Sequence, residues 1–158
     1  MTESQQKQAW VSSLRLLAAT PKTRKELAKK LLDKGYPEEV VEETLSKLEN
    51  DGLLSDLAYA KNLAAKLTQG KPSGRRKISF EMKRHGVPGN IQEEVLSGIT
   101  GEDEVERALE LAKPKWQSFQ RLPEDKRKKR LFDFLMRRGF DYEIVRETVE
   151  KLAINNEI

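Results

Sequence analysis

Few residues in this 158-residue chain could perform chemistry. It has one histidine, His85, and no cysteine, which excludes thiolate nucleophiles, disulfides and cysteine metal sites. The carboxylates between Glu38 and Glu43 have no histidine or cysteine nearby to complete a metal site, and acids at a helix start are favoured by the helix dipole. The segment 70–74 lacks the spacing of a phosphate-binding loop. We therefore expect no enzyme activity, no cofactor and no small-molecule substrate.

Cations are abundant and unevenly distributed. The net charge is +4, yet the segment from Pro37 to Leu57 is acidic and the segment from Lys113 to Arg138 is strongly basic. A smaller basic stretch runs from Lys71 to Arg84. Such asymmetry favours an anionic or charge-patterned partner, although a solvated helix face is the alternative for any single stretch.

Helices must position these cations, because apolar residues recur with helical spacing along the chain and no segment alternates like a strand. Thr23 and Glu26 form a capping-box pattern, and Gly35 is expected to end that helix in a left-handed conformation. Further boundary signals are Pro37, expected in a first helical turn, and the capping residues Ser55 and Thr100. No apolar run reaches the roughly 18 residues of a membrane span, so we expect a soluble protein.

The chain contains an internal repeat that becomes visible when it is aligned on Gly35, Gly86 and Gly139, which are 51 and 53 residues apart. Six apolar columns then match in all three copies, with spacings that keep them on one helical face. The columns lie eight and four residues before the glycine and one, five, ten and thirteen residues after it. In that order they are Leu27/Ile78/Leu131, Leu31/Met82/Leu135, Tyr36/Val87/Phe140, Val40/Ile91/Ile144, Leu45/Leu96/Val149 and Leu48/Ile99/Leu152.

A further helix is expected before each pair, near residues 5–19, 56–68 and 102–119. In the first of these, Trp10, Leu14 and Leu17 should face inward, and Pro114 should kink or split the third. We predict an all-α fold of three tandem three-helix repeats that resemble helix-turn-helix units. The repeats span residues 5–52, 55–99 and 101–153 and should stack into an elongated, curved array.

Basic residues also repeat, in two columns ten and eleven residues before each glycine. They fall where the second helix of each copy should begin, and cations there oppose the helix dipole by about 0.3–1 kcal/mol each when exposed. The ten-before column lies about 160° from the core column, on the solvent side. We interpret this basic comb as a grip on a polyanion or an acidic surface, the alternative being inheritance from a duplicated ancestor. With their basic neighbours, the candidate contact residues are Arg24, Lys25, Arg75, Arg76, Lys77, Lys83, Arg84, Lys128, Lys129, Arg130, Arg137 and Arg138.

The chain resembles the bacterial RecX family, regulators of the RecA recombinase, over nearly its whole length. The resemblance is carried by segments 26–36, 48–56 with Tyr59 and Ala60, 74–86 and 134–140. The family usually has a proline where Arg75 follows Gly74, and a charged residue where Ala58 stands. Neither departure touches the core columns.

The resemblance implies tandem three-helix repeats and a regulator that binds the RecA–single-stranded-DNA filament and inhibits or modulates its recombinase, ATPase and co-protease activities in DNA repair. The absence of cysteine fits a reducing cytosol, so we expect a cytoplasmic protein. We also expect a monomer, and weak contact with single- or double-stranded DNA stays open. One alternative is a helix-turn-helix DNA-binding protein acting without RecA, although the third helix of the first copy is acidic. Another is a single-strand chaperone, although Phe80, Phe119, Phe132 and Tyr142 are the only candidates for base stacking and most are expected in the core.

Overall fold

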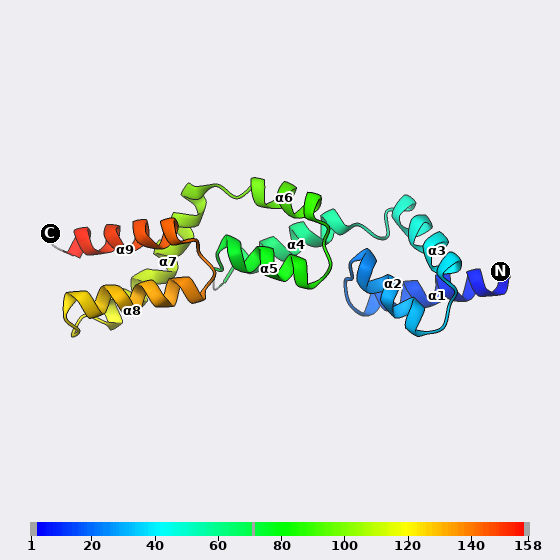
Figure 1. The fold of residues 1–158 in the computed structure, drawn as a ribbon, viewed down its shortest axis with the longest axis horizontal. Coiled ribbons are helices and arrows are strands. Elements are labelled where there is room, and N and C mark those ends of the chain that lie inside the picture. The colour runs from blue at the N-terminus through cyan, green and yellow to red at the C-terminus, as the bar shows by residue number, and fades with distance from the viewer. Residues whose placement is uncertain (1–2, 71, 157–158) are drawn as a thin grey trace. The chain divides into compact units, whose positions relative to one another are not determined.

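A computed structural model describes residues 3–70 and 72–156, and within them the chain is helical, with no strand (Figure 1). The helices are α1 (Glu3–Ala19), α2 (Arg24–Asp33), α3 (Glu38–Asn50), α4 (Asp56–Thr68), α5 (Arg75–Arg84), α6 (Gly89–Ser97), α7 (Gly101–Ser118), α8 (Glu124–Arg137) and α9 (Tyr142–Asn156). They follow the predicted order of three helices per repeat. Lys71, the first residue of the smaller basic stretch, lies outside the described residues.

The three aligned glycines end the second helix of each repeat. Gly35, Gly86 and Gly139 have φ angles of 95°, 84° and 88°, a left-handed conformation that side chains disfavour. After α2, the amide of Tyr36 donates to the carbonyl of Leu31 (3.3 Å), and equivalent bonds follow the other two glycines. This Schellman motif brings the residue after the glycine against the residue four before it, which explains why both columns are apolar.

The predicted helix starts are confirmed at three positions. The Thr23 side chain accepts from the amide of Glu26, whose carboxylate in turn accepts from the amide of Thr23, so the capping box is complete. Ser55 caps α4 and Thr100 caps α7 through their hydroxyl oxygens. Pro37 is the residue before α3 rather than part of its first turn.

Pro114 does not split its helix, so that part of the prediction is wrong. α7 runs without interruption from residue 101 to 118. Proline removes the bond to the carbonyl of Glu110, but both residues are exposed on the water side of the helix. Water can therefore satisfy that carbonyl, which reduces the cost of the missing bond.

The chain divides into two compact units that do not coincide with the repeats. Unit 1 comprises residues up to 62 together with 82–92, and unit 2 comprises residues 63–81 together with those from 93 onward. The dividing points fall within α4, α5 and α6, so the second repeat is shared between the units. Each junction between successive repeats consequently lies inside one unit.

Unit 1 has a core of leucines and valines between α1, α2 and α3, formed by Leu27, Leu31, Val41, Leu45, Leu48 and Leu54. Trp10 and Leu17 are half-buried and pack against it, as expected. Leu14, however, is 38% exposed, and Ala9 and Ser13 face the core instead. The inward face of α1 is therefore rotated from the predicted one, because small residues allow α1 to approach its neighbours closely.

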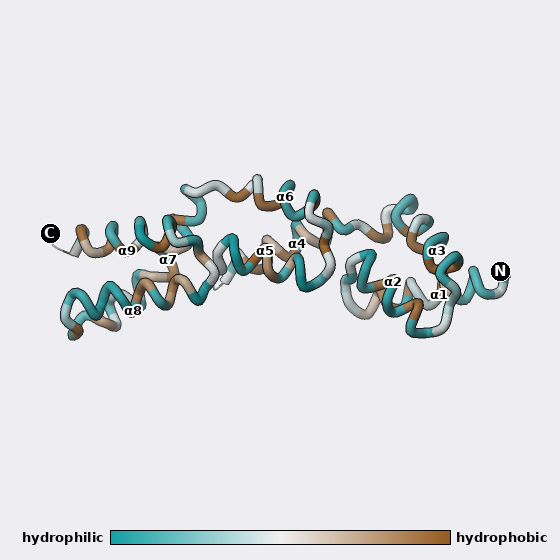
Figure 2. Tube along the Cα trace, viewed as in Figure 1, coloured by the Kyte–Doolittle hydropathy of each residue, from teal (hydrophilic) through white to brown (hydrophobic). Residues whose placement is uncertain are grey.

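Unit 2 has a larger core that fills the space between α7, α8 and α9. Its buried members are Ala108, Ala112, Trp116, Leu131, Leu135, Phe140, Val145, Val149, Leu152 and Ala153. By contrast, α6 has no fully buried residue, and Ile91, Leu96 and Ile99 of the predicted core columns are only half-buried. Figure 2 shows hydrophobic residues spaced along the helices rather than gathered in long runs. Among the described residues no helix is long and apolar enough to cross a membrane.

Candidate partner-binding surface

Arg24 and Arg75, from the eleven-before column of the basic comb, are engaged within the protein. The guanidinium of Arg24 pairs with Glu42 and Glu49 of α3, with its Nε 2.9 Å from Glu49 Oε1. Arg75 Nη1 donates to the carbonyl of Leu96 at 2.8 Å, near the end of α6. Each arginine thus ties the second helix of its repeat to the third. This internal role explains a cation at a helix start, where the dipole disfavours it.

The ten-before column remains on the surface, where Lys25, Arg76 and Lys129 are all exposed. The third copy departs from the prediction because α8 begins one turn early, at Glu124. Lys128 and Lys129 therefore lie in the second turn rather than the first. Lys128 Nζ lies 3.4 Å from Glu124 Oε1, a surface ion pair of small energetic value.

In unit 1 the start of α2 packs against the glycine turn that follows α5. The Thr23 hydroxyl donates to the carbonyl of His85 at 2.6 Å, and the amide of Arg24 donates to Asp56 Oδ1 at 2.8 Å. A Cβ at Gly86 would lie 2.8 Å from Lys25 Cδ, so the lysine stem covers this glycine closely. The following repeat thereby supplies an acceptor for one of the free amides at the helix start, that of Arg24.

Unit 2 repeats this arrangement between α5 and the turn after α8. The amide of Gly74 donates to the carbonyl of Arg138 (2.9 Å), and the amide of Arg76 donates to the carbonyl of Gly139 (3.0 Å). The amide of Arg75, a group that proline would lack, donates to Glu104 Oε1 at 2.9 Å. Burial raises the pKa of Glu104, which is 3% exposed.

The third copy has Arg127 at the position that corresponds to Thr23 and Gly74, twelve residues before the glycine. Arg127 is buried, and its Nε and Nη2 donate to the carbonyl of Trp116 at 2.9 and 2.7 Å. Its guanidinium also stacks on the Trp116 ring, 3.7 Å from the centroid. This position therefore serves the third repeat internally, where in the other copies it meets the next repeat.

The single histidine reaches across the junction of unit 1. His85 Nδ1 lies 2.9 Å from Glu26 Oε2, and its ring centroid lies 5.6 Å from that of Tyr59. Burial favours the neutral form of Glu26, but bonds from His85 and from the amide of Thr23 outweigh it and hold the pKa of Glu26 below its usual value. The histidine therefore links α5 to the capping box of α2.

A basic hollow of about 610 Å³ lies beside this pair in unit 1. Its cations come from α2 and from the end of α5, and they are Lys25, Lys29, Lys83 and Arg84. Lys25, Lys29 and Lys83 are exposed and make no ion pair or hydrogen bond within residues 3–70 and 72–156. An adjoining hollow of about 470 Å³ adds Lys30. The sequence interpretation omitted Lys29 and Lys30, although Lys29 lies one turn after Lys25 on the exposed side of α2.

The remaining candidates lie in unit 2, where they divide into exposed and engaged residues. Lys77 is half-buried and packs on the turn after α8: a Cβ added to Gly139 would lie 2.5 Å from Lys77 Cβ. Arg138 Nη2 donates to the carbonyl of Pro72 at 3.2 Å. Arg137 is exposed, and Arg130 lies 5.9 Å from the ring centroid of Phe119. The structure thus leaves Arg76, Lys129, Arg130 and Arg137 as exposed cations of this unit.

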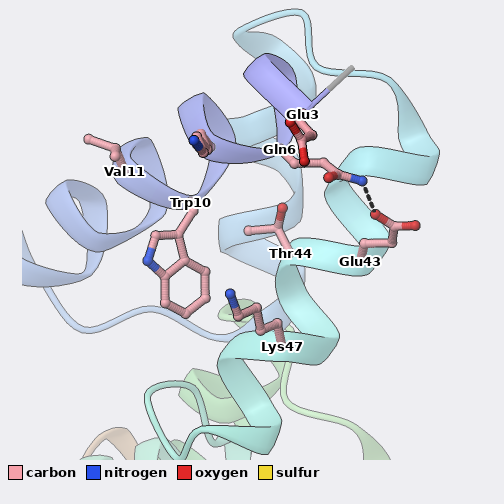
Figure 3. Close-up of a pocket in the computed structure, with 8 residues that line it drawn as sticks. Glu3, Gln6, Trp10, Val11, Glu43, Thr44 and Lys47 are labelled. Atoms are coloured by element: carbon pink, nitrogen blue, oxygen red, sulfur yellow. Dashed lines mark hydrogen bonds between the residues drawn. The ribbon is translucent and has the colours of Figure 1, made fainter. Parts of the chain in front are cut away.

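A third hollow of about 430 Å³ lies between α1 and α3 of unit 1 (Figure 3). Trp10 forms one wall, and Gln6 Nε2 donates to Glu43 Oε2 across the rim at 2.8 Å. Lys47 Nζ lies 4.5 Å from the centroid of the Trp10 ring. The internal lysine already covers the aromatic face, so this hollow does not offer an open stacking surface.

Three-helix units, each with a left-handed glycine turn between its second and third helices, define a helical-repeat protein. Within the part of the chain that the structure describes, no group of three or more metal-ligating side chains is present. Family models for the first, second and third three-helix domains of RecX match residues 9–48, 55–96 and 102–149. The chain belongs to the RecX family.

Curated relatives support this membership over almost the full length. The regulatory protein RecX of Chlorobaculum tepidum is 38% identical, covering 99% of this chain and 95% of the relative. That of Chlorobium limicola is also 38% identical, over 96% and 94% of the two chains. The crystal structure of RecX from Lactobacillus salivarius has the same fold, with a TM-score of 0.91, 22% identity and coverage of 97% and 99%.

Proposed function

We propose that this protein binds the RecA–single-stranded-DNA filament and limits its recombinase, ATPase and co-protease activities. The observation that carries the proposal is the match of all three repeats to the RecX family, whose resemblance implies RecA as the partner. The relatives are named regulatory proteins, which agrees with a chain that acts by binding.

The exposed lysines of the basic hollow, Lys25, Lys29 and Lys83, support the same proposal. A nucleoprotein filament presents DNA phosphates and acidic side chains, and exposed cations attract both in a salt-dependent manner. Lys29 and Lys83 are better probes than Arg24 or Arg75, because the two arginines also hold the third helices of their repeats. By contrast, α3 exposes Glu38, Glu39 and Glu43, which would repel the phosphates of a duplex and disfavour a recognition helix there.

The test is the ATPase rate of RecA on single-stranded DNA during titration with this protein at two salt concentrations. We expect inhibition below the RecA concentration, and weaker inhibition at the higher salt because the attraction is screened. The double variant Lys29→Glu/Lys83→Glu should inhibit less than the wild type. The matched control Lys61→Glu/Lys66→Glu makes the same change in net charge on exposed residues of α4 and should inhibit like the wild type.

The outcomes separate the two parts of the proposal. If equimolar protein leaves the ATPase rate unchanged, RecA is not the target. If the two double variants weaken inhibition equally, net charge matters and the hollow has no special role.

A further inference from the structure

The basic hollow of unit 1 has an apolar lining as well as cations. Leu32 and Ala28 line it from α2, and Leu32 is 43% exposed. Leu32 follows Lys25 by seven residues and Lys29 by three, so these side chains lie on one face of the helix. Single exposed leucines are ordinary on protein surfaces, but this one lines a hollow between α2 and the end of α5. The hollow can therefore take an apolar group as well as a charged one.

Positive charge is in excess around this hollow. Glu26 and Asp33 contribute carboxylates to its lining. Glu26 Oε2 lies 2.9 Å from His85 Nδ1, so this acid is already engaged within unit 1, whereas Asp33 is exposed at the end of α2. The basic side chains that line the hollow are Lys25, Lys29, Lys83 and Arg84. A ligand that carries several negative charges is therefore favoured there.

The apolar lining favours a peptide over a nucleic acid as this ligand. Proteins that hold single strands stack the bases on aromatic rings. Among residues 3–70 and 72–156, no phenylalanine, tyrosine or tryptophan lines this hollow. The nucleic-acid backbone also carries no aliphatic side chain that would cover Leu32. A short acidic peptide carries both carboxylates for the lysines and an apolar side chain for Leu32, and basic clusters recognise acidic motifs in this way.

We propose that the basic hollow binds an acidic peptide segment of a partner protein. An aliphatic or aromatic side chain of that segment packs on Leu32 and serves as its anchor. Glutamate or aspartate residues on either side of the anchor pair with Lys25 and Lys29 of α2 and with Lys83 at the end of α5. The inference rests on the proposed function only in taking RecA as the protein that supplies the segment.

The test is fluorescence anisotropy of two labelled synthetic peptides, measured with the full chain and without RecA. The first peptide repeats the block Glu-Glu-Leu-Glu, and the second has serine in place of every leucine, which keeps the charge and removes the anchors. The wild-type protein should bind the leucine peptide at least about fivefold more tightly than the serine peptide, because Leu32 gains an apolar contact. The affinity for both peptides should fall as the salt concentration rises.

Two variants separate the apolar contact from the charge. Leu32→Ser should lower the affinity for the leucine peptide at least about fivefold and leave that for the serine peptide unchanged. Lys29→Glu/Lys83→Glu should weaken the binding of both peptides. Val11→Ser is the matched control, because Val11 is an apolar residue of α1 in unit 1 that is 45% exposed and lies outside the basic hollow. It should bind both peptides like the wild type.

Overlapping synthetic peptides that span RecA then test the source of the segment. Those that bind should carry acidic residues around an apolar one and should bind Leu32→Ser more weakly than the wild type. Equal wild-type affinity for the leucine and serine peptides would overturn the inference, because the hollow would then be a general site for anions, phosphates included. No binding of either peptide would overturn it as well. If the leucine peptide binds as expected but no RecA peptide does, the inference holds for acidic segments and RecA is excluded as their source.

Discussion

Gly74 offers the sharpest test of how the repeats are joined. It is buried directly before α5, and its own amide and that of Arg76 donate to the turn after α8. A Cβ at Gly74 would overlap the backbone of Gly139 and Phe140, which cannot rotate away as a side chain would. Gly74→Ala therefore has to push the start of α5 away from the turn and weaken both hydrogen bonds.

The expected cost follows from these contacts. Overpacking against rigid neighbours costs about 1–3 kcal/mol, and two weakened hydrogen bonds add about 1 kcal/mol each. The lower entropy of the unfolded alanine chain offsets about 0.4–1 kcal/mol of this. We expect unit 2 to lose about 3 kcal/mol, which lowers its urea midpoint by about 1–3 M.

Each unit has one tryptophan, so the loss can be measured in unit 2 alone. Trp116 is buried in unit 2, and Trp10 lies in unit 1. In a Trp10→Phe background, urea unfolding followed by tryptophan fluorescence reports on unit 2. Gly101→Ala is the control, because no atom lies within 4 Å of the added Cβ and the backbone has an ordinary conformation. If Gly74→Ala is as stable as this control, the close contact between α5 and the Gly139 turn does not exist.

Two further predictions concern the same architecture. Gly139→Ala should destabilise the protein more than Gly35→Ala. Both substitutions incur left-handed strain of about 1 kcal/mol, but only at Gly139 does a neighbour, Lys77 Cβ, lie 2.5 Å from the added Cβ. Equal shifts of the urea midpoint would contradict this. Burial raises the pKa of Glu104 above its ordinary 4.5, so the folded state holds that proton more tightly and stability from this group is lost as pH rises. Glu104→Gln keeps an acceptor for the amide of Arg75. The unfolding free energy of this variant minus that of the wild type should increase from pH 4 to pH 7. A difference that stays constant over this range would refute the burial argument.

The repeat and its helix boundaries could be predicted from the sequence, because the interactions that set them are local. A left-handed glycine, a capping threonine and the apolar residue after a helix act within about six residues of one another. The bonds at Gly35 and the capping box at Thr23 are examples. A periodic basic column was equally visible, and its ten-before members are indeed exposed.

The roles of individual polar residues could not be predicted in this way. Arg24 and Arg75 look identical to their exposed neighbours in a sequence window, and only the placement of the third helix turns them into internal contacts. The partner of His85 is Glu26, 59 residues away, and no local pattern specifies that pairing. The inward face of α1 was misjudged in part for a related reason: Leu14 is exposed, while the small residues Ala9 and Ser13 are buried.

The sequence by itself thus determined three helical repeats, their glycine turns and a surplus of basic residues, since each depends on neighbours along the chain. Only the tertiary structure decided which cations are unpaired, that Phe80 is exposed, and that Gly74 must lack a side chain. These properties arise where residues distant in sequence meet, as at Gly74 and Gly139, and the energy of such contacts depends on positions that local periodicity leaves unspecified.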